Sequence, residues 1–413
     1  MNHITFRWAI AGVLSLLLAS CGAVGTPTTP TSSRVEVPQS TPSPMPTVTP
    51  PADGGTSNQQ SLQTTFETIY QQVNPSVVNI HVVDGASSNS QGSIPFFSPP
   101  SQGVQSALGS GFVWDENGDI VTNHHVIAGA TDIEVTFSDG TTVPGKVVGS
   151  DPDSDLAVVK VNVPARDLKP VSMGDSSLVK VGQIAMAIGN PYGLQGSMTE
   201  GIISALGRML PVSNTSNSGA NYTIPDVVQT DASINPGNSG GVLLNAAGQV
   251  IGVTSAIISP DQASAGIGFA IPAAIVEQVV PSLISTGHYE HPYIGIEGTT
   301  LTPDMATAMN LSASQRGALV INVQAGSPAG KAGLKGGNQQ ATIAGLQVEV
   351  GGDVITGVDG TPVNSFDDLV TYLARNTQVG QTINLTVLRN GAQMTVKLTL
   401  AARPTGSQAQ ATP

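Results

Sequence analysis

The stretch that decides the fold reads Thr230-Asp231-Ala232-Ser233-Ile234-Asn235-Pro236-Gly237-Asn238-Ser239-Gly240-Gly241. A serine hydroxyl becomes a nucleophile when a base takes its proton and a third group orients that base. The glycines let the chain turn so that the backbone N–H groups of Gly237 and Ser239 can converge on an oxyanion. Alone, the same residues would also suit a glycine-rich hairpin. Ser239 is therefore a candidate nucleophile whose partners must be sought elsewhere in the chain.

Gly237–Gly241 also fits the Gly-x-Ser-x-Gly turn of α/β-hydrolases. In that turn a helix follows the serine, and the acid and the histidine lie downstream. Here the serine is followed by Val242–Leu244, a turn and Val250–Val253, which are runs typical of strands. The hydrolase interpretation is therefore rejected, and the base and the acid should lie upstream of Ser239.

Few histidines can supply the base. His3 lies in the predicted signal peptide, and His81 lies in the first predicted strand. His288 and His291 lie in a connection between two halves of the chain. His124 and His125 remain, adjacent to each other at the end of a strand. Spacing alone does not choose between these two neighbours.

The acid should lie on an adjoining segment, buried beside the imidazole. Asp155 opens the apolar strand Leu156–Val163, whereas Asp151 and Asp153 have the character of turn residues. The resulting order of histidine, aspartate and serine is that of chymotrypsin-like double barrels.

The residues around this constellation predict strands and turns, with no alternation of strand and helix. The first predicted strand is Val77–Val83, after a short amphipathic helix over Leu62–Gln72. The predicted strands from Gly109 to Ala270 are Ile120–Asn123, Ile133–Phe137, Val143–Gly149, Leu156–Val163, Ile184–Ile188, Ile202–Leu206, Val227–Thr230, Val242–Leu244, Val250–Ile258 and Gly266–Ile271. This spacing of strands and turns is typical of barrels or of a sandwich, so we expect an all-β-dominated fold.

The C-terminal part of the chain reads as a second unit behind a linker helix. The helix is predicted over Pro272–Thr286 and ends at Gly287. A second helix begins at Ser365, with Asp368 completing a capping box. Arg389-Asn390-Gly391-Ala392 predicts a type I′ hairpin between two strands.

The single cysteine, Cys21, follows a basic residue and a short apolar run, which predicts a signal peptide over residues 1–20. Leu18–Gly22 resembles the lipobox of bacterial lipoproteins, in which the cysteine is acylated. Residues 21–61 are rich in Thr, Pro and Ser and predict a disordered tether. The sequence thus predicts an extracytoplasmic protein held to a membrane through lipid on Cys21.

Composition excludes some partners. The net charge of −13 argues against nucleic acid, because nucleic acid requires basic patches. No cluster with the spacing of metal ligands is visible, and the chemistry predicted for Ser239 needs no cofactor.

These motifs together resemble the HtrA/Deg family of trypsin-like serine proteases that carry PDZ domains. The matching segments are Gly109–Phe112, Thr122–Val126, Ser154–Val158, Ala187–Leu194, Gly201–Ala205, Thr230–Leu243 and Gly266–Pro272. The resemblance implies His125 as the base, with His124 at a variable position. It implies Asp155 as the acid and Ser239 as the nucleophile, with Asn190–Leu194 near the active site.

The resemblance also implies a chymotrypsin-like double β-barrel over residues 62–287, a PDZ domain over 288–402 and a polar tail over 403–413. Tyr293-Ile294-Gly295-Ile296 matches the loop that binds a peptide's C-terminal carboxylate. The peptide would add as a strand between Ile296 and the Ser365–Asn376 helix. Lys335–Val350 departs from the family, being longer than the usual connection.

The function implied by this resemblance is cleavage of unfolded or damaged proteins in the cell envelope. The alternative is a catalytically silent, peptide-binding chaperone of the same fold. Family members often form trimers through the N-terminal segment, which makes Phe66 and Tyr70 candidate contacts in a homotrimer.

The residues of the specificity pocket predict what is cut. In trypsin-like barrels the pocket floor lies six residues before the nucleophile, which is Ser233 here. Cleavage after Lys or Arg would need an acid at that depth. Asp231 is expected to have a structural role, while Ile267 and Ile234 narrow the wall. The sequence therefore predicts cleavage after small or medium aliphatic residues.

Overall fold

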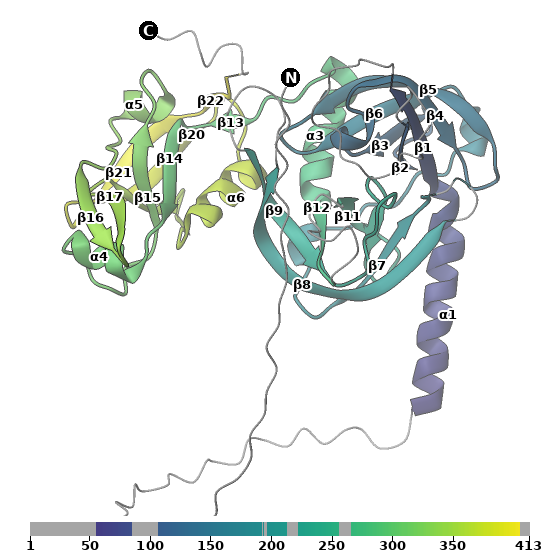
Figure 1. Ribbon diagram of the computed structural model, residues 1–413, viewed down its shortest axis with the longest axis horizontal. Coiled ribbons are helices and arrows are strands. Elements are labelled where there is room, and N and C mark those ends of the chain that lie inside the picture. Colours follow the sequence, from purple (N-terminus) through teal and green to yellow (C-terminus); the bar gives the residue numbers. More distant parts are fainter. Residues whose placement is uncertain are drawn as a thin grey trace, which may run out of the picture. The chain divides into compact units, whose positions relative to one another are not determined.

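A computed structural model describes residues 55–84, 106–191, 193, 196–212, 222–255 and 266–404. Strands dominate, and twelve of them form two closed antiparallel barrels (Figure 1). Residues 292–402 form a further unit with its own sheets. The prediction of an all-β-dominated double barrel is confirmed.

The first barrel has the strand order β1-β2-β3-β6-β5-β4. Its core contains Val78, Ile80 and Val82, alternate residues of one strand, as a barrel wall requires. The strands are β1 (Val77–Asp84), β2 (Ser106–Val113), β3 (Asp119–Thr122), β4 (Ala130–Thr136), β5 (Thr142–Asp151) and β6 (Leu156–Val161).

The second barrel has the order β10-β11-β12-β9-β8-β7. Its strands are β7 (Ile184–Gly189), β8 (Ser197–Val212), β9 (Tyr222–Thr230), β10 (Val242–Leu244), β11 (Val250–Ser255) and β12 (Gly268–Pro272). β8 extends well beyond the predicted Ile202–Leu206. Its register against β9 shifts three times, and such bulges break the alternation of side chains by which strands are recognised.

A linker helix, α3 (Ala273–Thr286), packs on strands of both barrels. Ile275 and Val279 share one buried cluster with Leu156 of the first barrel and Val242 of the second. The helix ends at Gly287, whose φ of +82° suits glycine at this position. The predicted linker helix is confirmed.

The N-terminal helix α1 covers Gly55–Val73 and thus begins before the predicted Leu62. Nothing in its polar first half breaks a helix, because no proline or glycine lies between Gly55 and the Asn74-Pro75 that follows it. Phe66 and Tyr70 pack against the core of their own chain, and the Tyr70 hydroxyl donates to the Gly196 carbonyl at 2.6 Å.

The C-terminal unit is built on a sheet of order β14-β15-β18-β20-β21, with β19 paired to β18. α6 (Phe366–Asn376) packs against this sheet and begins with the predicted Ser365–Asp368 capping box. The predicted hairpin is also confirmed, since Asn390 and Gly391 both have positive φ. The other elements are β13 (Pro292–Tyr293), β14 (Ile296–Thr300), α4 (Pro303–Ala308), β15 (Ala318–Val323), α5 (Pro328–Ala332), β18 (Val354–Val358), β19 (Thr361–Pro362), β20 (Thr382–Arg389), β21 (Ala392–Thr399) and β22 (Ala401–Ala402).

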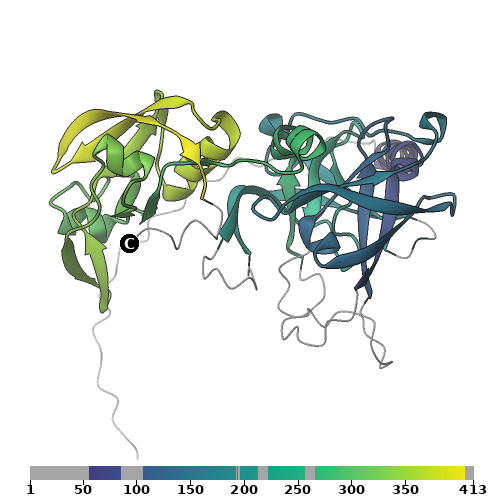
Figure 2. The ribbon, with the colours of Figure 1, turned by 90° about the horizontal axis from the view of Figure 1, so that it is seen from above.

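The long connection over Lys335–Val350 contains two strands of its own. β16 (Gln339–Ile343) and β17 (Leu346–Val350) pair as a separate two-stranded sheet (Figure 2). Ala344 and Gly345 turn the chain with positive φ. This departure from the expected short connection is thus an ordered hairpin.

Several predictions fall outside the described residues. These are the signal peptide, Cys21 and most of the tether. Within the residues described, no helix is both long and apolar enough to cross a membrane.

Candidate active site

Ser239 lies in the loop between β9 and β10 and is buried, with 6% of its surface exposed. The loop turns at Pro236-Gly237, where the Asn238 N–H donates to the Asn235 carbonyl at 2.9 Å. Gly237 has φ +91°, so Pro and Gly occupy the second and third positions of a type II turn. A Cβ on Gly237 would come within 2.5 Å of Pro191. The local sequence thus dictates the turn that leads into Ser239.

His125 and Asp155 meet because their strands are neighbours. His125 lies in α2 (His124–Ile127), directly after β3, and Asp155 directly precedes β6, which pairs with β3. His125 Nδ1 lies 2.9 and 2.8 Å from the two carboxylate oxygens of Asp155. The backbone N–H of His125 also donates to Asp155 Oδ1 at 3.0 Å, which holds the acid beside the imidazole.

The structure distinguishes His125 from its neighbour. His124 uses its backbone N–H to bond the carbonyl of Asp155, at 3.1 Å. Its ring Nδ1 is buried without a hydrogen-bond partner among the described residues. Burial lowers the pKa of His124, and the charge of Asp155 offsets this only in part. Thus Asp155 holds the ring of His125 and not that of His124.

Ser110 of β2 joins the nucleophile loop to the first barrel. Its backbone N–H donates to the Ser239 carbonyl at 2.8 Å, and its hydroxyl donates to the Gly237 carbonyl at 2.6 Å. The Ser110 hydroxyl in turn accepts the Asn190 N–H at 2.8 Å. The sequence did not reveal this role, although Ser110 lies within Gly109–Phe112, a segment that resembles the HtrA/Deg family.

Strand β11 links the same loop to the acid. The Gly240 N–H donates to the Thr254 carbonyl at 2.8 Å, and the next residue, Ser255, donates its hydroxyl to Asp155 Oδ2 at 3.2 Å. Ser255 was also missed, because nothing in an apolar strand signals a partner 100 residues upstream. The two barrels therefore bring the Ser239 loop and the His125–Asp155 pair to one place.

The candidate oxyanion donors are the backbone N–H groups of Gly237 and Ser239. Within the described part of the chain, no acceptor takes the Gly237 N–H. The Ser110 hydroxyl engages the Gly237 carbonyl, so this peptide segment is fixed from the other barrel. Fixed backbone donors are what stabilises a developing negative charge in acyl transfer.

The predicted pocket residues have three different environments. Ser233 is half-buried, and its carbonyl accepts the Thr199 hydroxyl at 2.9 Å. Ile234 is buried in the core of the second barrel, where it covers Gly268, whereas Ile267 is 48% exposed. Asp231 accepts the Ile202 N–H at 2.6 Å, which is the structural role expected of it.

The predicted peptide site lies at the edge of the C-terminal sheet. Ile296 begins β14, the edge strand, and α6 packs beside that strand. Gly295 has φ +80°, and its carbonyl accepts the Gln324 N–H at 3.0 Å. Ile294 is buried in the core, and Tyr293 donates its hydroxyl to Gln324. An edge strand beside a helix can accept an added strand.

A cluster that the sequence did not reveal lies near the active site. Asp151, Asp153 and His291 bring three possible metal-ligating atoms within 4.8 Å of one another. His291 Nε2 lies 2.7 Å from Asp151, and Arg403 lies 3.2 Å from Asp153. The expectation of no metal-ligand cluster rested on spacing along the chain, whereas tertiary folding joins residues 140 positions apart.

Comparison with known families agrees with this geometry. Residues 109–253 match the trypsin-like peptidase domain, and residues 292–400 match the PDZ domain. The fold and the site therefore define a trypsin-like serine peptidase domain followed by one PDZ domain.

The relatives place the chain more narrowly. It is 43% identical over 301 residues to Protease Do-like 1, chloroplastic, of Arabidopsis thaliana, covering 73% of this chain and 65% of the relative. It is 39% identical over 341 residues to the periplasmic pH-dependent serine endoprotease DegQ of Escherichia coli, covering 80% and 69%. A solved HtrA-type protease, AlgW with a decapeptide, superposes with a TM-score of 0.61 at 33% identity, covering 82% and 99%.

The chain belongs to the HtrA family of serine proteases. It spans 53–69% of the length of the curated relatives that it matches.

Proposed function

We propose that this chain is a serine endopeptidase that uses Ser239, His125 and Asp155. The observation that carries the proposal is the pairing of His125 Nδ1 with both oxygens of Asp155, next to the tightly bonded Ser239 loop. Because Nδ1 is occupied by the acid, Nε2 remains as the atom that can take a proton from the serine.

The reaction follows from these positions. Ser239 Oγ attacks the peptide carbonyl while His125 Nε2 accepts its proton, and buried Asp155 stabilises the imidazolium. The N–H groups of Gly237 and Ser239 bind the oxyanion, and His125 then gives its proton to the leaving amine. A water molecule, deprotonated by the same imidazole, then attacks the acyl carbon, and the bond to Ser239 Oγ breaks as the imidazolium returns its proton to that oxygen.

The substrate class is inferred from the peptidase and PDZ domains together. Unfolded or damaged polypeptides would be cut at Ser239, and their C-termini would be recognised at Tyr293–Ile296. Support comes from the open edge of β14 and from the solved relative that carries a decapeptide. The relatives named as periplasmic support an extracytoplasmic site of action. A role in quality control of envelope proteins is inferred from the resemblance to the HtrA/Deg family.

The test is digestion of fluorescently labelled casein by the wild-type chain and by Ser239→Ala. We expect a rise in fluorescence with the wild type that Ser239→Ala abolishes. If the wild type and Ser239→Ala both bind casein and neither cuts it, the chain is instead a silent peptide-binding chaperone.

A further inference from the structure

The turn between β5 and β6 carries Asp155 in an uncommon backbone conformation. Its φ is +55°, in the left-handed region that residues other than glycine rarely adopt. Such a conformation persists where its surroundings hold it in place. The carbonyl of Asp155 accepts the Asn123 side-chain amide at 2.9 Å, which fixes one side of this peptide.

Asp151 fixes the other side of the turn. One of its oxygens accepts both the N–H of Ser154, at 3.1 Å, and the Ser154 hydroxyl, at 2.5 Å. The other oxygen accepts the Asp153 N–H at 3.3 Å. A single buried carboxylate thus bonds the two residues that directly precede Asp155.

Asp151 is itself held from outside the two barrels. His291, which directly precedes β13, places Nε2 at 2.7 Å from Asp151 Oδ2 and donates its hydrogen there. Burial would raise the pKa of Asp151, but the hydrogen bond and charge of His291, together with the bonds inside the turn, hold that pKa below its usual range. The carboxylate therefore remains ionised at neutral pH.

The other end of the PDZ domain reaches the same turn. Arg403 directly follows β22, and its guanidinium lies 3.2 Å from Asp153. β22 pairs with β13, and the Arg403 N–H donates to the His291 carbonyl at 3.0 Å. The entry and the exit of the domain are thus joined where they meet the turn. We call Asp151, Asp153, His291 and Arg403 the Asp151 cluster.

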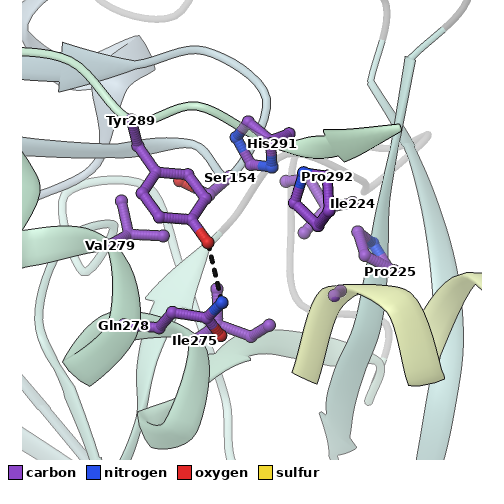
Figure 3. Close-up of a pocket in the computed structure, with 10 residues that line it drawn as sticks. Ser154, Ile224, Pro225, Ile275, Gln278, Val279, Tyr289, His291 and Pro292 are labelled. Atoms are coloured by element: carbon purple, nitrogen blue, oxygen red, sulfur yellow. Dashed lines mark hydrogen bonds between the residues drawn. The ribbon is translucent and has the colours of Figure 1, made fainter. Parts of the chain in front are cut away.

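The position of His291 is defined by its neighbours. Its ring meets that of Tyr289 edge to face, with centroids 4.8 Å apart, and Gln278 of α3 donates to the Tyr289 hydroxyl at 2.7 Å (Figure 3). The cavity beside them has a volume of about 20 Å³, which is room for about one water. The side chains of the Asp151 cluster already bond one another, His291 to Asp151 and Arg403 to Asp153.

We propose that His291 and Asp151 are positioning residues for the peptidase reaction. Through them the PDZ domain holds the turn that presents Asp155 to His125. The inference rests on the proposed peptidase activity. Without His291, Asp151 would be a buried carboxylate with fewer partners, and the turn would relax around Asp155. His125 would then be oriented less well, which lowers the rate of the chemical step rather than the binding of substrate.

The test measures the nucleophilicity of Ser239 directly in the full chain. Diisopropyl fluorophosphate labels a reactive serine and is small enough to need no peptide site. We expect His291→Leu to lower the labelling rate about tenfold and to lower kcat on a peptide substrate, with KM changed less than about twofold. His291→Gln retains a hydrogen-bond donor and should stay within about threefold of the wild type. Arg403→Gln, at the exposed side of the cluster, should lower the rate about threefold.

Arg375→Gln is the matched control. Arg375 of α6 forms an ion pair with Asp226 of β9, which is a second bond between the PDZ domain and the barrels but does not touch the Asp155 turn. Its labelling rate should equal that of the wild type. Melting curves of each variant ensure that rates are compared on folded protein.

Each other outcome is decisive. Equal labelling of His291→Leu and wild type, with the wild type reactive, overturns the positioning role alone. An equal loss of labelling rate in Arg375→Gln would overturn the positioning role, because it would mean that any contact between the PDZ domain and the barrels affects Ser239. Labelling that responds to Zn²⁺ in the wild type but not in His291→Leu overturns it in favour of a metal site. A wild type that is never labelled removes the proposed peptidase activity, and the positioning role with it.

Discussion

At the scale of the residue, His124 and His125 are adjacent in the chain but differ in what their rings contact. The ring of His125 bonds both oxygens of Asp155, while the buried Nδ1 of His124 has no hydrogen-bond partner within the described chain.

We therefore expect His125→Ala to lower kcat on casein by about 10⁴-fold or more. The double variant His125→Ala with Ser239→Ala should have a kcat close to that of either single variant, because the residues act as one unit. His124→Ala should keep activity within about tenfold of the wild type, since its backbone N–H still bonds Asp155. The opposite pattern would reassign the base to His124.

The cleavage preference also belongs to single residues. Ser233 carries no charge, and the carboxylate of Asp231 is used by the Ile202 N–H. A substrate lysine or arginine would thus find no partner acid from these two residues. We expect most cuts in casein after Val, Ala, Ile or Leu, with a graded preference, because one methylene of misfit is worth about 1–3 kcal/mol. Mass-spectrometric mapping of the fragments measures this. A majority of cuts after Lys or Arg would contradict the assigned pocket.

At the scale of the element, β14 and α6 form the proposed peptide groove. The end of β14 is bonded to the start of α6 through the Thr300 hydroxyl, which accepts the Phe366 N–H at 3.0 Å. The strand edge can pair with a peptide, and the loop at Gly295 can take its terminal carboxylate.

In full-length Ser239→Ala, peptides that end in a free carboxylate and an apolar residue should bind, as measured by fluorescence polarisation. C-terminal amidation should weaken binding about tenfold or more, because it removes a charge-assisted hydrogen bond. Equal affinity for the amidated peptide would show that Tyr293–Ile296 does not bind a carboxylate.

The turn between β5 and β6 should make stability depend on pH. The pKa of Asp151 is lower in the folded chain than its usual value, so its contribution is present above the usual carboxyl pKa and is lost as pH falls through the lowered value.

Asp151→Asn should therefore cost about 1–3 kcal/mol at pH 7, and this difference should shrink below about pH 4. Thermal melts between pH 7 and pH 3 measure it. Asp167→Asn makes the same chemical change at an exposed ion pair and should have little effect at any pH. A pH-independent loss in Asp151→Asn would mean that the ionised carboxylate is not what stabilises the turn.

At the scale of the whole molecule, the predicted lipid on Cys21 would attach the protease domain to a membrane. Cys21 lies outside the described residues, so this prediction rests on the sequence alone.

Cys21→Ala should move the chain from the membrane fraction to the soluble fraction, or leave it unprocessed. A purified fragment starting at Gly55, which lacks Cys21, should cut casein as well as the full chain does, because α1 and both barrels lie within it. Membrane fractionation by ultracentrifugation measures the first outcome. Unchanged membrane association with normal processing would remove the lipid anchor.

The double barrel was implied by the order of the triad residues and by the resemblance to the HtrA/Deg family. The residues by themselves determined the all-β-dominated fold, the linker helix, the capping box of α6 and the hairpin at Asn390-Gly391. These features depend on neighbours along the chain, such as turn residues and the alternation of strands. Ser239 could likewise be identified as a candidate nucleophile from the sequence, because the neighbouring glycines and Pro236 shape its turn locally.

The spacing of residues left open whether His124 or His125 meets Asp155; the family resemblance implied His125, and the tertiary structure shows that contact. Tertiary structure alone decided which other residues hold the site together. Ser110 and Ser255 bond the nucleophile loop and the acid across the two barrels, and His291 and Arg403 reach the Asp155 turn from the PDZ domain. Arg403, which the sequence assigned to a polar tail, is one of these contacts. The presence of a hydroxyl, an imidazole or a guanidinium in the sequence does not reveal which distant residue it will bond. The role of such a group depends on closing the strands into barrels, which brings distant segments within the 3 Å or so that a hydrogen bond requires.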